Sequence, residues 1–257
     1  MSRPVFSIEE RDRVRDRLLE MARADRRVVA GAMVGSLALG GGDRWSDLDL
    51  TFGLAPGSKA ADLLAEWTRD LEREFGAVHL FDLPFLSTIY RVFLFPGSLQ
   101  VDISFTPGAE FGALGPRFKL LFGETVERAY PPTPAAPHLF GLGVHHAVRA
   151  RFCIERGRPW QAEYWIREVR DHALSLACLR HGLAPNYGRG YDDLPAETMA
   201  GITEALVHST DRAELLRALR CAIEALLRQA EEVRGLASKV EAQLRGLVSA
   251  GWPRGDE

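Results

Sequence analysis

Two aspartates separated by one leucine follow a glycine-rich loop near the start of the chain. The stretch from Gly35 to Leu50 reads GSLALGGGDRWSDLDL. On a strand, side chains alternate between two faces, so Asp47 and Asp49 would share one face while Leu48 and Leu50 pointed into the core. Two carboxylates that close repel each other unless a cation lies between them, and Mg²⁺ bound to substrate phosphates suits such oxygen ligands. The pair therefore indicates a metal–nucleotide site.

The loop and a later acid support the same interpretation. Backbone N–H groups beside Gly35, together with the hydroxyl of Ser36, can hold triphosphate oxygens. Asp102 interrupts the apolar stretch LQVDISF. An acid buried on such a strand is costly unless it faces a ligand or a metal. Asp102 is therefore the third candidate carboxylate.

These residues resemble the motif of the polymerase-β-like nucleotidyltransferase superfamily. The matching features are Gly35-Ser36, Gly40, Asp47-Leu48-Asp49 and a later Asp102 in a Val-Asp-Ile strand. The resemblance covers about the first half of the chain. One departure is Leu-Ala-Leu at positions 37–39, where many relatives carry an arginine that contacts phosphate.

The resemblance implies a reaction and a set of roles. A nucleoside monophosphate, AMP from ATP or the corresponding group of another nucleoside triphosphate, would pass to a hydroxyl while pyrophosphate leaves. Asp47 and Asp49 would bind Mg²⁺, and Asp102 would complete the ion near the attacking hydroxyl, with two ions about 3.5 to 4 Å apart. Gly35, Ser36, Asp47 and Asp49 would bind the nucleotide.

The second half resembles, more faintly, the antibiotic nucleotidyltransferases of the kanamycin type, through the stretch GYDDL at 190–194. This implies a small-molecule acceptor, an aminoglycoside-like or lincosamide-like antibiotic, for which Asp192 and Asp193 could provide negative charge. Glu155 lies about where those enzymes keep the base that deprotonates the acceptor, with Glu163 as the next candidate. A glutamate at a helix end beside arginines is also commonly a solvated ion pair.

Two other functions compete with this one. Arg167 and His172 give R-x-x-x-x-H, a spacing similar to the RNase motif of HEPN domains, although chance matches are common in an arginine-rich helix. An antitoxin-like protein that attaches AMP to a partner protein would use the same three aspartates. His145 and His146 are adjacent and would face different directions on a helix, which favours a core or interface role for one of them. We expect Lys119 to lie at the surface, in preference to contacting a phosphate.

Helical and strand patterns predict an α+β fold with two domains. Residues 1–130 would form a mixed sheet flanked by helices, the nucleotidyltransferase domain, and 131–257 an all-α bundle that binds the acceptor. The predicted helices and strands of the first domain are 8–24, 28–34, 48–54, 59–75, 78–81, 88–95 and 99–105. A capping box at Ser7 and Glu10 begins the first helix, and Pro96-Gly97-Ser98 forms a turn.

The boundary lies at the proline-rich stretch PPTPAAP, which follows Tyr130 and cannot be helical. Beyond it, four long helices are expected, over 138–156, 160–181, 195–208 and 211–247.

Composition narrows the class of protein. The chain has 257 residues, 46% of them hydrophobic, and a net charge of −3. Such a charge does not favour a long nucleic acid as partner. The three cysteines lack metal-site spacing, and the charged N-terminal stretch lacks a signal-peptide core. We therefore expect a cytoplasmic protein that does not bind a membrane. A homodimer is compatible with these features.

Overall fold

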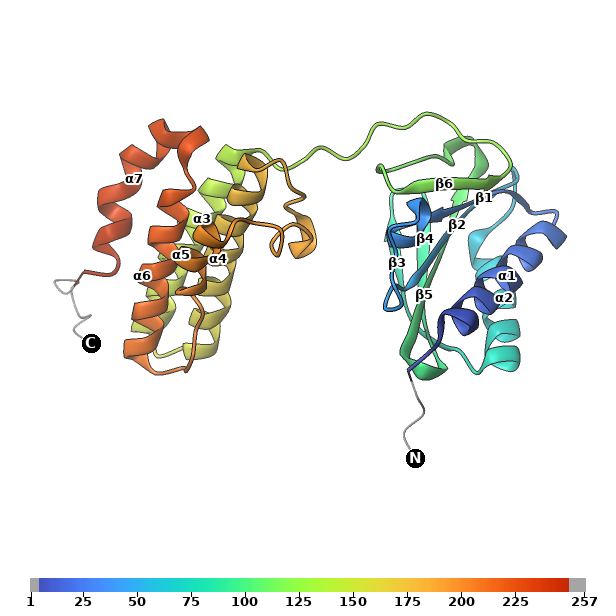
Figure 1. Cartoon of the computed structure of the whole chain (residues 1–257), viewed down its shortest axis with the longest axis horizontal. Coiled ribbons are helices and arrows are strands. Elements are labelled where there is room, and N and C mark those ends of the chain that lie inside the picture. The colour runs from blue at the N-terminus through green and yellow to red at the C-terminus, as the bar shows by residue number, and fades with distance from the viewer. Residues whose placement is uncertain (1–4, 250–257) are drawn as a thin grey trace. The chain divides into compact units, whose positions relative to one another are not determined.

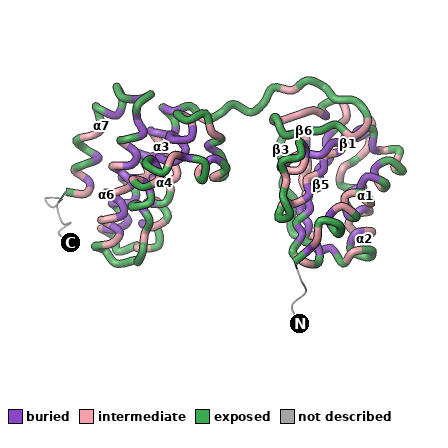
Figure 2. The backbone as a smooth tube through the Cα atoms, viewed as in Figure 1, coloured by how far each residue is buried: buried purple, intermediate pink, exposed green. Residues whose placement is uncertain are grey.

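The computed structural model describes residues 5–249 and divides the chain into two compact units, Met1–Pro131 and Pro132–Glu257 (Figure 1). The first four residues of the charged N-terminal stretch lie outside the described residues. Each unit has a core of its own (Figure 2), with buried positions between the sheet and its helices in the first and between helices in the second. The predicted fold class, a mixed sheet with helices followed by a helical bundle, is confirmed.

A six-stranded sheet forms the first unit, in the order β3-β4-β5-β2-β1-β6. Its strands are β1 (Val28–Val34), β2 (Leu48–Leu54), β3 (Val78–Phe85), β4 (Thr88–Phe95), β5 (Leu99–Pro107) and β6 (Phe118–Phe122). The pair β2–β5 is parallel, and the other neighbours are antiparallel. This one parallel pair joins the two strands that carry the candidate acids.

Helices α1 (Ile8–Ala24) and α2 (Ala60–Phe75) cover one face of the sheet (Figure 1). Their apolar residues share a buried cluster with strand residues such as Leu48 and Leu50, which are 0% and 1% exposed. Burial of apolar side chains from both layers stabilises this packing. The face that carries Leu48 and Leu50 is therefore the core face, as the alternation predicts.

The ends of these helices follow from local chemistry. The hydroxyl of Ser7 accepts a hydrogen bond from the backbone N–H of Glu10 at 3.1 Å, and the Glu10 carboxylate accepts one from the Ser7 N–H at 2.8 Å. These two bonds satisfy N–H groups that a helix start leaves unpaired, so the predicted capping box is confirmed. Helix α2 ends at Phe75 and is capped by Gly76, whose left-handed φ of 66° favours glycine.

Strand β6 is absent from the sequence-based prediction. It adds to the edge of the sheet beside β1, where Phe118 pairs with Val34. The segment FKLLF is short and has no alternating pattern. Its strand conformation therefore depends on pairing with β1, which local sequence does not reveal.

The second unit is a bundle of helices. Its helices are α3 (Ala136–Glu155), α4 (Pro159–Arg180), α5 (Ala196–Thr203), α6 (Arg212–Arg228) and α7 (Arg234–Gly246). The expectation that no part of the proline-rich stretch is helical is wrong at its end, because Ala136 and Pro137 form the first turn of α3, where proline is tolerated. The predicted helix over 195–208 is shorter in the structure, because it ends at Thr203. In the described part of the chain, no helix has the length and apolar composition that crossing a bilayer requires.

The prediction of one helix over 211–247 is wrong. The chain leaves the helical path after Arg228, makes a short turn that includes Glu231–Val233, and begins α7 at Arg234. Ala230 and Val233 in this turn are buried in the bundle core, and α7 packs back against α3 and α6. Tertiary burial thus outweighs a helical pattern that contains no proline or glycine at the break.

Candidate active site

The register of the parallel pair places two of the candidate acids side by side. Asp49 on β2 is directly aligned with Asp102 on β5, and the next aligned pair on the same face is Thr51 with Ser104. The Ser104 hydroxyl donates a hydrogen bond to the Thr51 hydroxyl at 2.8 Å. Leu48 and its neighbours of the same parity face the helices, so both carboxylates lie on the opposite face of the sheet.

Asp47 immediately precedes β2 and acts electrostatically on Asp102. Burial raises the pKa of Asp102, the Gln100 side chain lowers it by donating a hydrogen bond at 3.2 Å, and the charge of Asp47 raises it again. Like charges held this close favour a bound cation, which would stabilise the ionised carboxylates. The donor set, with oxygen ligands throughout, fits Mg²⁺.

The glycine-rich loop lies directly against these acids. Gly35 follows β1, has a φ of 72°, and leaves no room for a methyl group, which would overlap the carboxylate of Asp49. The hydroxyl of Ser36 is buried and has no hydrogen-bond partner within residues 5–249. A buried hydroxyl without a partner is costly, so a ligand oxygen at this position would satisfy it.

Arg11 holds the turn before Asp47, and sequence reasoning missed it. Its guanidinium, 5% exposed, donates hydrogen bonds to the carbonyl oxygens of Asp43 at 2.7 Å and Ser46 at 2.9 Å. The sequence did contain an indication of this role. Arg11 precedes the buried Val14 by one helical turn and therefore stands on the apolar face of α1. A charged residue at such a position needs polar partners, which the turn supplies.

The turn itself presents an exposed aromatic ring. The carboxylate of Asp43 accepts a hydrogen bond from the backbone N–H of Trp45 at 2.8 Å and another from the Ser46 hydroxyl at 3.2 Å. The Trp45 side chain is 63% exposed, with the Arg44 guanidinium 4.1 Å from its ring centre. The turn thus places an indole two residues before Asp47.

A cavity of about 140 Å³ continues along the same face of the sheet. Hydroxyl groups from Thr51, Tyr90 and Ser104 line it, together with the side chains of Arg117 and Arg128. Burial raises the pKa of Tyr90, the charge of Asp49 raises it further, and Arg128 opposes both effects. The cavity therefore adjoins the acids and offers positive charge.

Lys119 does not share this face. It pairs with Met33 on β1, whereas Asp49 pairs with Val34. Paired residues point to the same side of a sheet and neighbours along a strand point to opposite sides. The register therefore places Lys119 on the opposite face from Asp49.

Glu155 belongs to the bundle, at the end of α3. Its carboxylate accepts hydrogen bonds from Arg212 at 2.9 and 3.0 Å and forms an ion pair with Arg151 at 2.7 Å. The Arg151 side chain is only 4% exposed. These contacts tie the end of α3 to the start of α6 and engage both carboxylate oxygens.

Arg167 and His172, the residues of the RNase-like spacing, are not brought together. Five residues along a helix correspond to about 140° of rotation. Arg167 lies against Tyr164 and Glu168, whereas the His172 ring is stacked on His146 of α3 at 5.1 Å between centroids. Of the histidine pair, His146 is the partly buried member and His145 is exposed.

No protein-family model matches this chain, and no curated protein matches it. Among solved structures, an aminoglycoside 6-adenyltransferase from Bacillus subtilis matches it with a TM-score of 0.40 and 12% identity, over 92% of this chain and 97% of that chain. A likeness this distant carries no argument about activity, which the site itself must supply.

Proposed function

We propose that the protein is a Mg²⁺-dependent nucleotidyltransferase that moves AMP from ATP to a hydroxyl of a small molecule. One observation carries the proposal, the alignment of Asp49 with Asp102 across β2 and β5, beside Asp47. The loop at Gly35 and Ser36 supports it, because it borders Asp49 and offers a buried hydroxyl that needs a partner.

Asp47, Asp49 and Asp102 would hold the metal. When bound, Mg²⁺ would neutralise charge on the phosphates and polarise the acceptor oxygen. Asp49 and Asp102 would also position the ion on the sheet, since β2 and β5 are central strands with neighbours on both sides. A rigid support of this kind suits a reaction that depends mainly on positioning and charge neutralisation.

The phosphates would be held by the loop and by the adjoining cavity. The Ser36 hydroxyl and the backbone N–H groups of the loop are donors of the kind that phosphate oxygens accept from. At about 140 Å³ the cavity is smaller than the roughly 300 to 1,000 Å³ of sites for whole ligands. It would therefore take one part of the nucleotide, beside Arg117 and Arg128.

In the transfer, the acceptor oxygen forms a bond to the α-phosphorus while the bond to the β-phosphate oxygen breaks and pyrophosphate leaves. The hydroxyl proton must pass to a base. Glu155 is the base that the sequence predicts, but its contacts with Arg151 and Arg212 favour a structural role. Glu163 is the next candidate, on sequence position alone.

The acceptor that we propose is an aminoglycoside-like or lincosamide-like antibiotic. The support is the GYDDL stretch, in which Asp192 and Asp193 are exposed and can meet a cationic ligand. Protein tyrosines are the competing acceptors, because the chemistry at the aspartates would be the same.

The test is release of pyrophosphate from ATP and Mg²⁺ with a panel of these antibiotics. We expect Asp47→Asn and Asp49→Asn to lower turnover by at least about 10² to 10³, as loss of a charge-stabilising group does. Asp62→Asn is the matched control, because Asp62 is exposed on α2 and lies outside the site. Equal release by the wild type and both site variants would contradict the proposal.

The acceptor is tested separately by mass. An antibiotic that gains one AMP supports the small-molecule acceptor. Labelling of a partner protein, with the antibiotics unchanged, would overturn that part and keep the transferase.

A further inference from the structure

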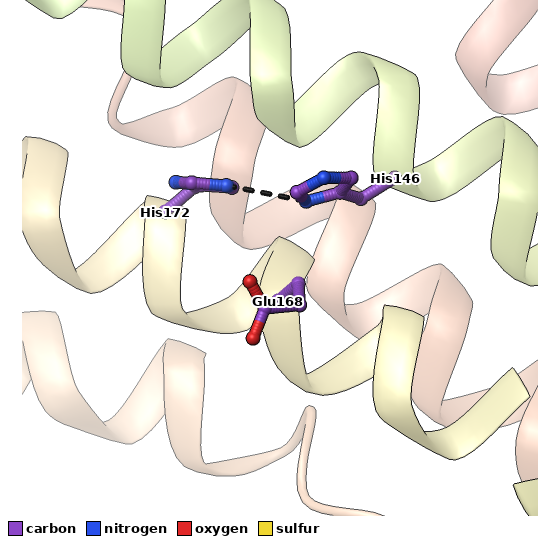
Figure 3. A group of neighbouring side chains, drawn as sticks. All are labelled: His146, Glu168 and His172. Atoms are coloured by element: carbon purple, nitrogen blue, oxygen red, sulfur yellow. Dashed lines mark hydrogen bonds between the residues drawn. The ribbon is translucent and has the colours of Figure 1, made fainter. Parts of the chain in front are cut away.

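We propose that the bundle contains a second metal site, formed by His146, Glu168 and His172, which takes a first-row transition ion such as Zn²⁺. Each residue offers one donor atom, and these atoms lie within 4.8 Å of one another. Figure 3 shows His146 on α3 facing His172 on α4, with the Glu168 side chain beside them. This site is independent of the aspartates, which belong to the other unit.

The helices bring these three side chains together. Glu168 and His172 are four residues apart on α4, a spacing that places both on one face of a helix. His146 comes from α3, which packs against α4. Two helices thus supply three donors, so the site depends on packing that the bundle core already stabilises.

The spacing of the two imidazoles fits a metal ion. The distance from His172 Nε2 to His146 Nδ1 is 3.2 Å. Bonds of 2.0 to 2.1 Å in a tetrahedral zinc site imply about 3.3 Å between donor atoms. An ion could therefore replace the hydrogen bond between the rings if each ring turns to aim its lone pair at the ion, while Glu168 reaches it by side-chain rotation.

The kind of ligand selects the kind of ion. Imidazole nitrogen suits Zn²⁺, Co²⁺, Ni²⁺ and Cu²⁺, whereas Mg²⁺ prefers oxygen ligands alone. Two imidazoles and one carboxylate leave a fourth position open for water or another ligand, as in catalytic zinc sites. The chain would then bind two different metals at two chemically different sites.

The surroundings hold the rings in place. His172 stacks on His146 at an interplanar angle of 28°, and the other side of the cluster includes Trp165, whose ring lies 4.8 Å from that of His146. Metal binding requires the neutral form of each ring, with the proton on the ring nitrogen that faces away from the ion.

Charged side chains near the three ligands affect how tightly the site would bind an ion. Glu168 accepts a hydrogen bond from Arg167 at 2.8 Å, an exposed contact that costs little to break. Arg149 lies over Trp165, 4.5 Å from the ring centre, and adds positive charge nearby. His138 and Asp171 also act on His172, with opposite signs. Because Arg149 and Arg167 are cationic, the proposed site needs the negative charge of the Glu168 carboxylate to attract a cation.

The test is titration of the full-length protein with Co²⁺ in excess Mg²⁺, which occupies oxygen-only sites. We expect one Co²⁺ per chain, with visible absorption bands typical of four or five ligands including nitrogen, and loss of the bands when Zn²⁺ displaces Co²⁺. Glu168→Gln and His172→Gln should each weaken binding by more than the roughly 10- to 100-fold that loss of an outer-shell partner costs.

His208→Ala is the control, because it also removes one imidazole, and His208 is exposed and has no described contact with the three ligands. It should keep the bands. Circular dichroism checks folding, and if His172→Gln fails to fold, the partly exposed Glu168 decides the outcome. Absence of the bands, or bands that persist in Glu168→Gln, would overturn the proposal. Bands that disappear in Asp49→Asn but not in the bundle variants would also overturn it, by locating the ion at the aspartates. None of these failures affects the proposed transferase.

Discussion

Asp102 in the sheet and Glu155 in the bundle are both acids in helices or strands of mainly apolar character, yet their neighbours have opposite charges. Asp102 meets an amide from Gln100 and the negative charge of Asp47. Glu155 meets the guanidinium groups of Arg151 and Arg212. The negative charge of Glu155 is therefore compensated by neighbouring positive groups. The negative charge of Asp102 is instead repelled by that of Asp47.

This difference separates two reasons for placing an acid in a protein. Glu155 ties α3 to the start of α6 and gains stability from its partners. Asp102 costs stability while the cation is absent, and such a cost persists in proteins mainly where a ligand removes it. Substitutions at the two positions should therefore have opposite effects on stability.

The largest effect is expected at Asp102. Asp102→Asn should lower turnover by about 10² to 10³, because a charge that stabilises the transition state is lost. The same change should raise the melting temperature without divalent metal, because it removes a half-buried charge. Turnover and thermal unfolding of the same preparation check both effects, and a less stable, fully active variant would contradict them.

The pH dependence of stability is a second test of whether the charge of Asp102 destabilises the folded protein. Burial and Asp47 raise the pKa of Asp102 in the folded state, so folding favours its protonated form. The stability from this group is present at low pH and is lost as pH rises through the raised pKa. We expect the melting temperature of Asp102→Asn, relative to wild type, to rise with pH over this range without divalent metal. A constant difference would show that Asp102 does not titrate as described.

The next largest effect is expected at Glu155. Glu155→Gln should lower the free energy of unfolding by about 1 to 3 kcal/mol, between the values for exposed and fully buried ion pairs, because the buried Arg151 would lose its ion pair with the carboxylate. Chemical denaturation measures this change. Glu241→Gln is the matched control, since Glu241 and Arg245 have the same helical spacing but are about half exposed.

The same variant tests the predicted base. With a structural role, turnover per folded molecule stays near that of wild type. A fall by about 10² to 10⁴ with unchanged ATP binding would instead identify Glu155 as the proton acceptor.

The smallest effect is expected at Ser36. Ser36→Ala removes one hydrogen bond to phosphate of about 0.5 to 1.5 kcal/mol, so ATP should bind roughly 2- to 13-fold more weakly. Calorimetric titration with Mg²⁺ present measures this change. Without nucleotide the variant should be no less stable than wild type, because the hydroxyl is buried and unpaired in the described structure. Unchanged ATP affinity would remove Ser36 from the proposed site.

Local patterns predicted the parts of the fold that local chemistry determines. The alternation at Leu48 and Leu50 identified the core face of β2, and Ser7 with Glu10 identified the start of α1. The pairing of β6 with β1 and the turn at Ala230 depend on residues far away in the chain, so local patterns did not reveal them.

The same distinction applies to the candidate site. The spacing of Asp47 and Asp49 is local and readable, and Asp102 stood out as an acid in an apolar strand. The alignment of Asp49 with Asp102 requires the parallel register, which only the structure provides. The contacts of Arg11 with the turn before Asp47 likewise join segments more than thirty positions apart.

The parallel pairing of β2 with β5 also has a consequence for the order of folding. Asp49 and Asp102 are separated by more than fifty positions, whereas α3 and α4 are joined by the three residues 156–158. Contacts between distant segments form slowly because a long loop must close first. We expect the α3–α4 hairpin to form early and the third acid to join the other two late. Pulsed hydrogen exchange during refolding would show amides of α3 and α4 protected before those of β5. The proposed metal site would then be complete only after β5 pairs with β2.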